Sequence, residues 1–295
     1  MRALRIHGYG GAEVMRIEEA PLPTAGPGEV RVRVRAASVN PIDWKMRQGL
    51  LAKIFPLHFP RTLGRDCSGE TDGGLIAGVA DPRRDGTHAE YAVLPVSATA
   101  PVPAAVEPAA AATLCVSGLS AWIPLVEVAN VKPGMRVLVH GGAGGVGSLA
   151  IQIARELGAR VVTTSTHAAY CHELGAERVV DYRREDFAGA GPFDVVLDTV
   201  GGETHVRSLE ALAPGGVLVA LSAAPVPPHA GRAEIRVERP QIQAKRERLE
   251  RIFAWAASGL LRPQVTRRFA LEEAKAAYAA VEAPHGRGKI ALNIS

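Results

Sequence analysis

The sequence has few cysteines and few aromatic residues. Its 295 residues include three cysteines, and Phe, Trp and Tyr together make up 5% of the chain. The cysteines Cys67, Cys115 and Cys171 are odd in number and far apart, which does not fit a disulfide framework. They are more typical of buried thiols in a reducing compartment, so we expect a cytoplasmic protein.

Charge and hydropathy argue against two classes of partner. The 34 Lys and Arg residues nearly balance the 30 Asp and Glu residues, leaving a net charge of +4 with the basic residues scattered. This predicts no nucleic-acid partner. We also recognise no apolar stretch of membrane-spanning length and no signal-peptide core at the N-terminus, and so expect no membrane association.

The most informative positive feature is a glycine-rich loop between an apolar strand and an apolar helical segment. Residues 137–147 read Val-Leu-Val-His-Gly-Gly-Ala-Gly-Gly-Val-Gly. In the G-x-G-x-x-G spacing, the first glycine permits a tight turn, the second admits a pyrophosphate, and the third lets helix and strand pack closely. A plain tight turn is the alternative. We predict dinucleotide binding by Gly142, Gly144, Gly145, Val146 and Gly147.

The pattern of the chain changes near residue 118. Before it lie short strand-like pieces, such as Glu29–Ala36, where valine and arginine alternate. After it, short apolar runs alternate with helical stretches, which indicates a doubly wound parallel sheet. The fold class is therefore α/β. We expect a mostly β first part of the chain and an α/β nucleotide-binding part from about residue 118.

The second strand of the inserted domain bears on the choice of cofactor. NAD-selective sites usually carry Asp or Glu after this strand, to bind the ribose 2′-hydroxyl. Here Val161-Val162-Thr163-Thr164 continues into Ser165-Thr166-His167, without a carboxylate. A hydroxyl at Ser165 tolerates a 2′-phosphate, which favours NADPH; the alternative is that Ser165 is only a turn residue.

Several segments taken together match one family. They are residues 38–45 (SVNPIDWK), 63–69 (LGRDCSG), 88–91 (HAEY), 118–122 (GLSAW), 141–147, 174–176 (LGA), 194–202 (DVVLDTVGG) and 287–290 (RGKI). Because these segments occur in this order, the chain resembles the zinc-independent quinone oxidoreductases of the medium-chain dehydrogenase/reductase superfamily. The resemblance implies a GroES-like β-rich catalytic domain formed by residues 1–117 and 260–295, a Rossmann NADP-binding domain inserted between them at 118–259, and a homodimer.

The resemblance also bears on metal binding. Alcohol dehydrogenase relatives bind catalytic zinc through a cysteine and a histidine at the positions that Asn40 and Arg65 occupy here. Cys115 lies near the position of the third ligand, but one thiol does not make a zinc site. We therefore expect no metal. Without such a Lewis acid, quinones and α,β-unsaturated carbonyls are the favoured hydride acceptors, because they delocalise the charge that develops.

The resemblance assigns roles to individual residues. Asn40 and Asp43 are the catalytic candidates. Asn40 is expected near the nicotinamide, or is a turn residue before Pro41. Asp43 is expected to stabilise its own loop rather than to transfer a proton. The further cofactor candidates are Ser120, Tyr182, Arg183, Thr199, Val200, Ser222 and Lys289. Ser120 could instead cap a helix covering 118–125, and Lys289 could be a surface charge on an edge strand.

The chain departs from the family between Gly69 and His88, where it is short. Asp72-Gly73-Gly74 is a good tight-turn sequence, so two strands could be joined directly. A trimmed hairpin is one interpretation, and a more open substrate site or a weakened catalytic domain is another.

The expected function is NADPH-dependent hydride transfer to a small-molecule quinone or α,β-unsaturated carbonyl. An enoyl-thioester reductase and a non-catalytic NADPH-binding redox sensor are the alternatives.

Overall fold

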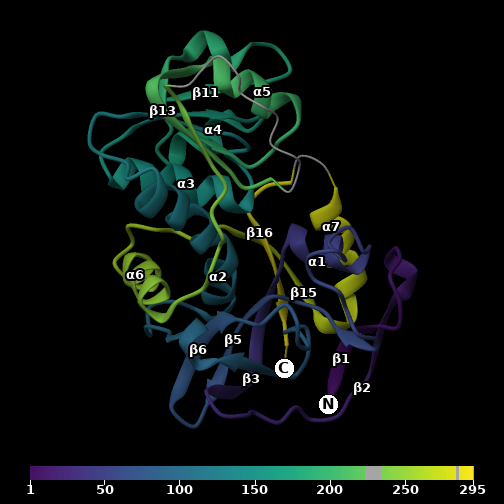
Figure 1. The fold of residues 1–295 in the computed structure, drawn as a ribbon. Helices are drawn as coiled ribbons and strands as arrows, with labels where there is room; N and C mark the ends of the chain where they lie inside the picture. The colour runs from purple at the N-terminus through teal and green to yellow at the C-terminus, as the bar shows by residue number, and fades with distance from the viewer. Residues whose placement is uncertain (223–233, 284–285, 295) are drawn as a thin grey trace. The chain divides into compact units, whose positions relative to one another are not determined.

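The packing of the chain divides it into two compact units. The computed structural model describes residues 1–222, 234–283 and 286–294 (Figure 1). Unit 1 comprises Met1–Leu119, Gln243–Gly259 and Pro263–Ser295, and unit 2 comprises Ser120–Ile242 and Leu260–Arg262. These boundaries differ from the predicted ones mainly at residues 243–259, which the sequence patterns placed with the nucleotide-binding domain.

The helix in that segment explains the difference. Helix α6 (Arg246–Ala257) buries Leu249, Ile252 and Phe253. Its Ile252 packs so closely on Gly118 that a Cβ there would lie 3.1 Å from Ile252 Cγ2. The apolar face of α6 therefore completes the core of unit 1.

Unit 1 is built on two mostly antiparallel sheets. One has the strand order β2-β1-β4, and the other has the order β15-β16-β3-β5-β6-β8, with β7 also paired to β3. The strands are β1 (Arg2–Ile6), β2 (Met15–Glu19), β3 (Glu29–Val39), β4 (Arg61–Thr62), β5 (Asp66–Thr71), β6 (Gly74–Val79), β7 (Tyr91–Pro95), β8 (Thr99–Pro101), β15 (Val265–Ala270) and β16 (Lys289–Asn293). The other helices are α1 (Pro41–Arg47), α2 (Pro108–Trp122) and α7 (Ala274–Glu282), with 3-10 turns η1 (Ala12–Val14), η2 (Val96–Ala98) and η5 (Leu271–Glu273).

Strand β3 is the centre of the larger sheet. The predicted alternation is confirmed, because Val32 and Val34 are buried while Arg31 and Arg33 are exposed. β3 pairs with β5 and β7, which are near to it in sequence, and with β16, which follows it by some 250 residues, so it joins distant segments of the chain.

The short segment after Gly69 forms a tight hairpin. β5 and β6 pair antiparallel from Asp66↔Val79 to Thr71↔Gly74, so only Asp72 and Gly73 lie in the turn. Gly74 has a φ of 103°, a conformation that favours glycine. The direct connection predicted from this Asp-Gly-Gly sequence is confirmed.

Unit 2 contains the predicted doubly wound sheet. Its six strands are all parallel, in the order β11-β10-β9-β12-β13-β14. The strands are β9 (Arg136–Val139), β10 (Arg160–Thr164), β11 (Arg178–Val180), β12 (Phe193–Asp198), β13 (Leu212–Ala220) and β14 (Arg236–Glu238). The helices are α3 (Gly145–Glu156), α4 (Ala168–Glu173) and α5 (Glu203–Glu210), with the π-helical segment η3 (Ile123–Val128) and the 3-10 turn η4 (Phe187–Ala190).

Both faces of this sheet are covered. Val137, Leu138 and Val139 on β9 are each fully buried, although successive side chains on a strand point to opposite faces. Such continuous burial is characteristic of a parallel sheet with helices on both sides.

Helix α2 corrects two expectations. It begins at Pro108, a residue that suits a first helical position, and not near Gly118. With η3 it forms an apolar helical stretch, Pro108–Val128, that could cross a membrane by length and composition. The expectation that no apolar stretch of the chain reaches membrane-spanning length is therefore wrong. Because 83% of its most apolar window is buried, it has the character of a core helix.

A buried arginine joins three parts of unit 1. Arg47, at the end of α1, is 1% exposed; its Nε donates to Gly10 O at 3.1 Å, and its Nη1 lies 2.9 Å from Glu282 Oε1. The guanidinium also lies 5.6 Å from the ring centroid of Tyr278 on α7. Figure 1 shows α7 running beside α1.

Replacing this arginine should destabilise unit 1 strongly. Arg47→Met leaves Glu282 and the Gly10 carbonyl without their partner, so we expect a loss of roughly 3 kcal/mol in the free energy of unfolding. Arg35→Met is the matched control, because the Arg35–Glu70 ion pair is exposed and should contribute under ~1 kcal/mol. Urea denaturation of both variants measures the difference, and equal losses would contradict it.

Candidate functional site

The glycine-rich loop of unit 2 has the close contacts that its sequence predicts. A Cβ on Gly142 would lie 2.0 Å from Thr163 Oγ1, and one on Gly147 would lie 2.2 Å from Gly141 O. Gly141 itself has a φ of 68°. Gly142 and Gly147 are thus required by the packing of β9, β10 and α3, as the G-x-G-x-x-G interpretation proposes.

The same loop leaves an anion-binding end on α3. Gly144 precedes the helix in extended conformation, and the first backbone bond of the helix runs from Ser148 N to Gly144 O. The N–H groups of Gly145, Val146 and Gly147 consequently have no partner within the helix. Together with the helix dipole, they suit a pyrophosphate, so the loop fits a bound dinucleotide.

Buried side chains hold this loop in place. Thr199 donates its hydroxyl to His140 O at 2.8 Å, and Gly141 N–H donates to Thr164 Oγ1 at 3.1 Å. The His140 ring lies between Thr164 and the Ser208 hydroxyl, and its burial lowers its pKa to about 4. A neutral His140 is thus part of the support of the loop, a role that sequence reasoning did not identify.

A second anchor holds the turn after β12. Asp198 is fully buried and accepts the N–H groups of Val200 and Gly201 at 2.9 and 2.8 Å, while His205 lies 2.9 Å from its other oxygen. This arrangement presents Val200 with 55% of its surface exposed. Thr199 and Val200 therefore lie at the carboxyl edge of the sheet, where open α/β sheets bind ligands.

At the end of β10, Ser165 is buried and accepts the N–H of His167 at 3.0 Å, which is a turn-stabilising bond. Ser222 follows β13 at the same edge of the sheet.

Two further cofactor candidates, Tyr182 and Arg183, follow β11. Tyr182 is 46% exposed. Arg183 holds Asp181 through two bonds of 3.0 and 2.9 Å, and this lowers the pKa of Asp181 to about 2. Arg183 thus neutralises the nearby carboxylate.

Ser120 is half-buried near the end of α2. The alternative that it caps the start of a helix is therefore wrong, since that helix begins twelve residues earlier, at Pro108.

Unit 1 contains a buried polar network centred on Asn40. The Asn40 amide nitrogen donates to Ser38 Oγ at 3.0 Å and to Asp66 Oδ1 at 2.9 Å. Lys289 Nζ donates to Asn40 Oδ1 at 2.6 Å and to Val39 O at 3.3 Å. The Asn40 side chain is thus fully hydrogen-bonded within unit 1, which goes beyond the expectation of a simple turn residue.

Lys289 and Asp66 are the two opposite charges of this network. Asp66 also accepts the Ser38 hydroxyl at 2.6 Å and Val116 N–H at 2.8 Å. Burial lowers the pKa of Lys289 and raises that of Asp66, while each charge opposes the shift of the other. The alternative for Lys289, a surface charge on an edge strand, is wrong, because Lys289 is 5% exposed and β16 lies between β15 and β3.

Asp43 lies one helical turn from Asn40. Its Oδ2 accepts Asn40 N–H at 2.7 Å, so it stabilises the start of α1, as the structural interpretation predicted. Its Oδ1 is buried and lacks a hydrogen bond among the described residues. Burial, and then the charge of Asp66, raise the pKa of Asp43 to about 7.

Ser38, Asp66, His88 and Tyr278 were not identified as site residues from the sequence. His88 Nε2 donates to Ser38 O at 3.0 Å, and the Tyr278 hydroxyl donates to His88 Nδ1 at 3.1 Å. Asp66 is the first residue of β5, whose sequence is mostly polar, so no local pattern distinguished its buried carboxylate from a surface acid.

The residues at the two former zinc-ligand positions do not fit a zinc ion. Both polar atoms of the Asn40 side chain are already hydrogen-bonded, and Arg65 is a cation whose Nη1 donates to Ala80 O. Cys115 donates its thiol to Ala111 O. Within the described ranges no group of three His, Cys, Asp or Glu side chains could hold a metal.

Comparison with known proteins agrees with both units. Residues 26–75 match the family model described as the alcohol dehydrogenase GroES-like domain, and residues 174–292 match the model described as zinc-binding dehydrogenase. The expected fold class, a GroES-like β-rich domain with an inserted Rossmann sheet, is confirmed.

Two curated relatives align over most of their length. The NAD(P)H oxidoreductase RTN4IP1, mitochondrial, of Mus musculus is 30% identical, with 100% of this chain and 89% of the relative covered. The trans-enoyl reductase pgmF of Aspergillus terreus is 29% identical, with 93% and 90% covered.

Two solved structures share the whole fold. The quinone oxidoreductase of Coxiella burnetii has a TM-score of 0.91 at 32% identity, covering 100% of this chain and 99% of that one. The Escherichia coli quinone oxidoreductase complexed with NADPH has a TM-score of 0.87 at 27% identity, covering 99% and 100%. This chain is an NAD(P)H-dependent oxidoreductase, and it belongs to the zinc-independent quinone oxidoreductases of the medium-chain dehydrogenase/reductase superfamily.

Proposed function

We propose that the protein transfers hydride from NADPH to a quinone or an α,β-unsaturated carbonyl. The observation that carries this proposal is the chemistry of the Asn40 network. It places the Asn40 amide, hydrogen-bonded to Asp66 and Lys289, where zinc-dependent relatives have a metal ligand, while the dinucleotide loop keeps its geometry. The two quinone oxidoreductase structures support the same substrate class.

The chemistry follows from which groups are present. Bound NADPH supplies the hydride. Because no metal polarises the acceptor, the acceptor itself must spread the negative charge, as a conjugated carbonyl does. We propose that Asn40, held by Lys289 and Asp66, keeps its loop in one conformation beside the nicotinamide or the substrate oxygen, since catalysis depends on pre-organised polar groups.

The preference for NADPH over NADH is part of the proposal. Ser165 stands where NAD-selective proteins carry an acid, and Arg183 neutralises Asp181. Tyr182, Arg183, Ser120, Thr199, Val200, Ser222 and Lys289 remain proposed cofactor contacts. The NADPH complex of the Escherichia coli relative supports this choice.

An enoyl-thioester reductase is the second candidate, favoured by the similarity to the trans-enoyl reductase pgmF. Both candidates add hydride to a carbon conjugated with a carbonyl, so they differ in the group attached to that carbonyl. A non-catalytic NADPH-binding redox sensor is the third.

A panel of acceptors separates these candidates. Following NADPH absorbance with 1,4-benzoquinone, 2-cyclohexen-1-one and crotonyl-CoA, we expect turnover with the first two at a kcat/KM at least tenfold above that with the thioester. A higher kcat/KM with crotonyl-CoA would instead support the enoyl reductase. Tight NADPH binding without oxidation by any acceptor would support the sensor.

The cofactor preference has its own measurement. We expect kcat/KM for NADPH to exceed that for NADH at least tenfold, because no carboxylate repels the 2′-phosphate. Arg183→Ala should reduce this ratio several-fold, by removing a cation and releasing the charge of Asp181. Arg160→Ala is the matched control. Arg160 forms a similar exposed ion pair with Glu177, but it lies at the start of β10, at the end of the strand remote from Ser165. A preference for NADH would contradict the assignment.

We also propose that the protein is a cytoplasmic homodimer that pairs through edge strands of its Rossmann sheet. Light scattering should give twice the mass of the chain, and a monomer at micromolar concentration would contradict the dimer.

A further inference from the structure

One carboxylate oxygen in unit 1 is buried without a hydrogen bond. Asp43 is 1% exposed, and its Oδ2 is occupied by Asn40 N–H, whereas Oδ1 has no partner in the part of the chain that the structure describes. Burying an anionic oxygen without a hydrogen-bond donor costs free energy. The cost falls if the oxygen holds a proton or accepts a hydrogen bond from a water molecule.

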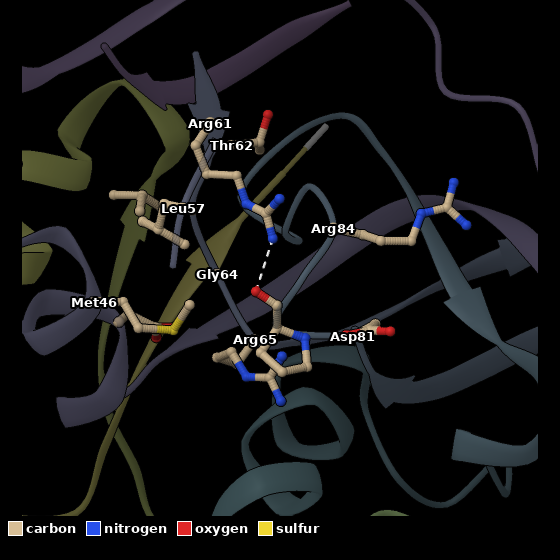
Figure 2. A pocket seen from close by; sticks show the side chains of 11 residues that line it. Met46, Leu57, Arg61, Thr62, Gly64, Arg65, Asp81 and Arg84 are labelled. Carbon is tan, nitrogen blue, oxygen red and sulfur yellow. Dashed lines mark hydrogen bonds between the residues drawn. The ribbon is translucent and has the colours of Figure 1, made fainter. Parts of the chain in front are cut away.

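The pocket beside Asp43 has room for that water. The space open to the centre of a water molecule is about 10 Å³, close to what a single water needs. Figure 2 shows Met46 and Leu57 at the left of this pocket, Arg61 above it, Arg65 below it and Asp81 to the right. Arg84, an exposed residue, also lines it, so a water in the pocket can exchange with solvent.

The charges around Asp43 come from several elements. Arg65 precedes β5 and Asp66 begins it, Lys289 lies on β16, and Tyr278 lies on α7, with its hydroxyl bonded to His88. Arg65 and Lys289 favour the ionised carboxylate, and Asp66 opposes it. Burial is the largest influence, and it brings the pKa to about 7, where both protonation states are populated near neutral pH.

We propose that Asp43 is the proton donor of the reduction and acts through a water held in this pocket beside Arg65. This inference rests on the proposed function. Hydride addition to the β-carbon of an enone leaves an enolate. The O–H bond at Asp43 Oδ1 breaks, the proton passes along the water, and a C–H bond forms at the α-carbon. The carboxylate then regains a proton from solvent. NADPH, one proton and the enone thus give NADP⁺ and the saturated carbonyl.

The choice of acceptor makes this step visible. An enolate needs a proton at its α-carbon to become the saturated product. An acid positioned to supply that proton accelerates this step, typically by 10²–10⁴-fold. Hydride addition to a quinone gives an aromatic hydroquinone anion, which leaves the enzyme without protonation at carbon. Removing the proton of Asp43 should consequently slow enone reduction far more than quinone reduction.

The test compares wild type, Asp43→Asn and Asp72→Asn with saturating NADPH. The amide of the D43N variant keeps an oxygen for the Asn40 N–H but carries no acidic proton. The D72N variant makes the same change at an exposed carboxylate in the β5–β6 turn, away from the pocket. We expect D43N to lower kcat with 2-cyclohexen-1-one at least 100-fold while kcat with 1,4-benzoquinone stays within about threefold. D72N should change neither by more than about threefold.

The pH profile supplies the readout that a structural role would not produce. In wild type, kcat with the enone should fall about tenfold per pH unit above about pH 7, because the donor must be protonated. In D43N this dependence should disappear. A wild-type profile that is flat from pH 5.5 to 9, or a D43N enzyme that retains the wild-type profile, would overturn the inference.

A stability measurement keeps the inference testable if D43N is inactive for another reason. The folded-state pKa of Asp43 lies above that of the unfolded chain, so wild type loses stability as pH rises towards 7, and D43N does not. The Tm of D43N minus that of wild type should increase between pH 5 and pH 8, and a constant difference would overturn the inference. Failure of the wild type to oxidise NADPH with any acceptor would instead count against the proposed function.

Discussion

The side chain of Asn40 is the junction on which unit 1 depends. Its amide bonds to Ser38, Asp66 and Lys289, which come from the end of β3, the start of β5 and the start of β16. Each of these partners is buried, and a buried polar group that loses its partner costs more than an ordinary hydrogen bond contributes. The network is therefore satisfied as a whole, and a change at one member affects the others. It positions α1, and with it Asp43, relative to the sheet.

The glycine loop of unit 2 is held by a different principle. At Gly142 and Gly147 the neighbouring atoms lie too close to leave room for a side chain. The hydroxyls of Thr164 and Thr199 hydrogen-bond to backbone groups of the loop and fix its shape. His140 is fully buried and stays neutral, so the loop is supported without a charge beneath the anion-binding end of α3. The positive character of that end then comes from the helix itself.

Much of this was predictable from short-range patterns. The alternation in β3, the two-residue turn at Asp72 and Gly73, and the strand–loop–helix around Gly142 each depend on neighbours in sequence, and each was predicted correctly. The network was not predictable in the same way. Nothing near Lys289 indicates that its ammonium meets Asn40, because that contact spans 249 positions and depends on how β16 pairs with β3. The placement of α6 in unit 1 was missed for the same reason.

The pairing of β16 with β3 has a consequence for how the protein is made. Ser38, Asn40 and Asp66 leave the ribosome early, but Lys289 is synthesised more than two hundred residues later. The parallel sheet of unit 2 contains no strand from the described residues after 238, so it can form while the chain is still growing. Until residue 289 emerges, Asp43 and Asp66, which are buried in the folded chain, lack the nearby positive charge of Lys289. Unit 1 can therefore be completed only after residue 289 has been synthesised.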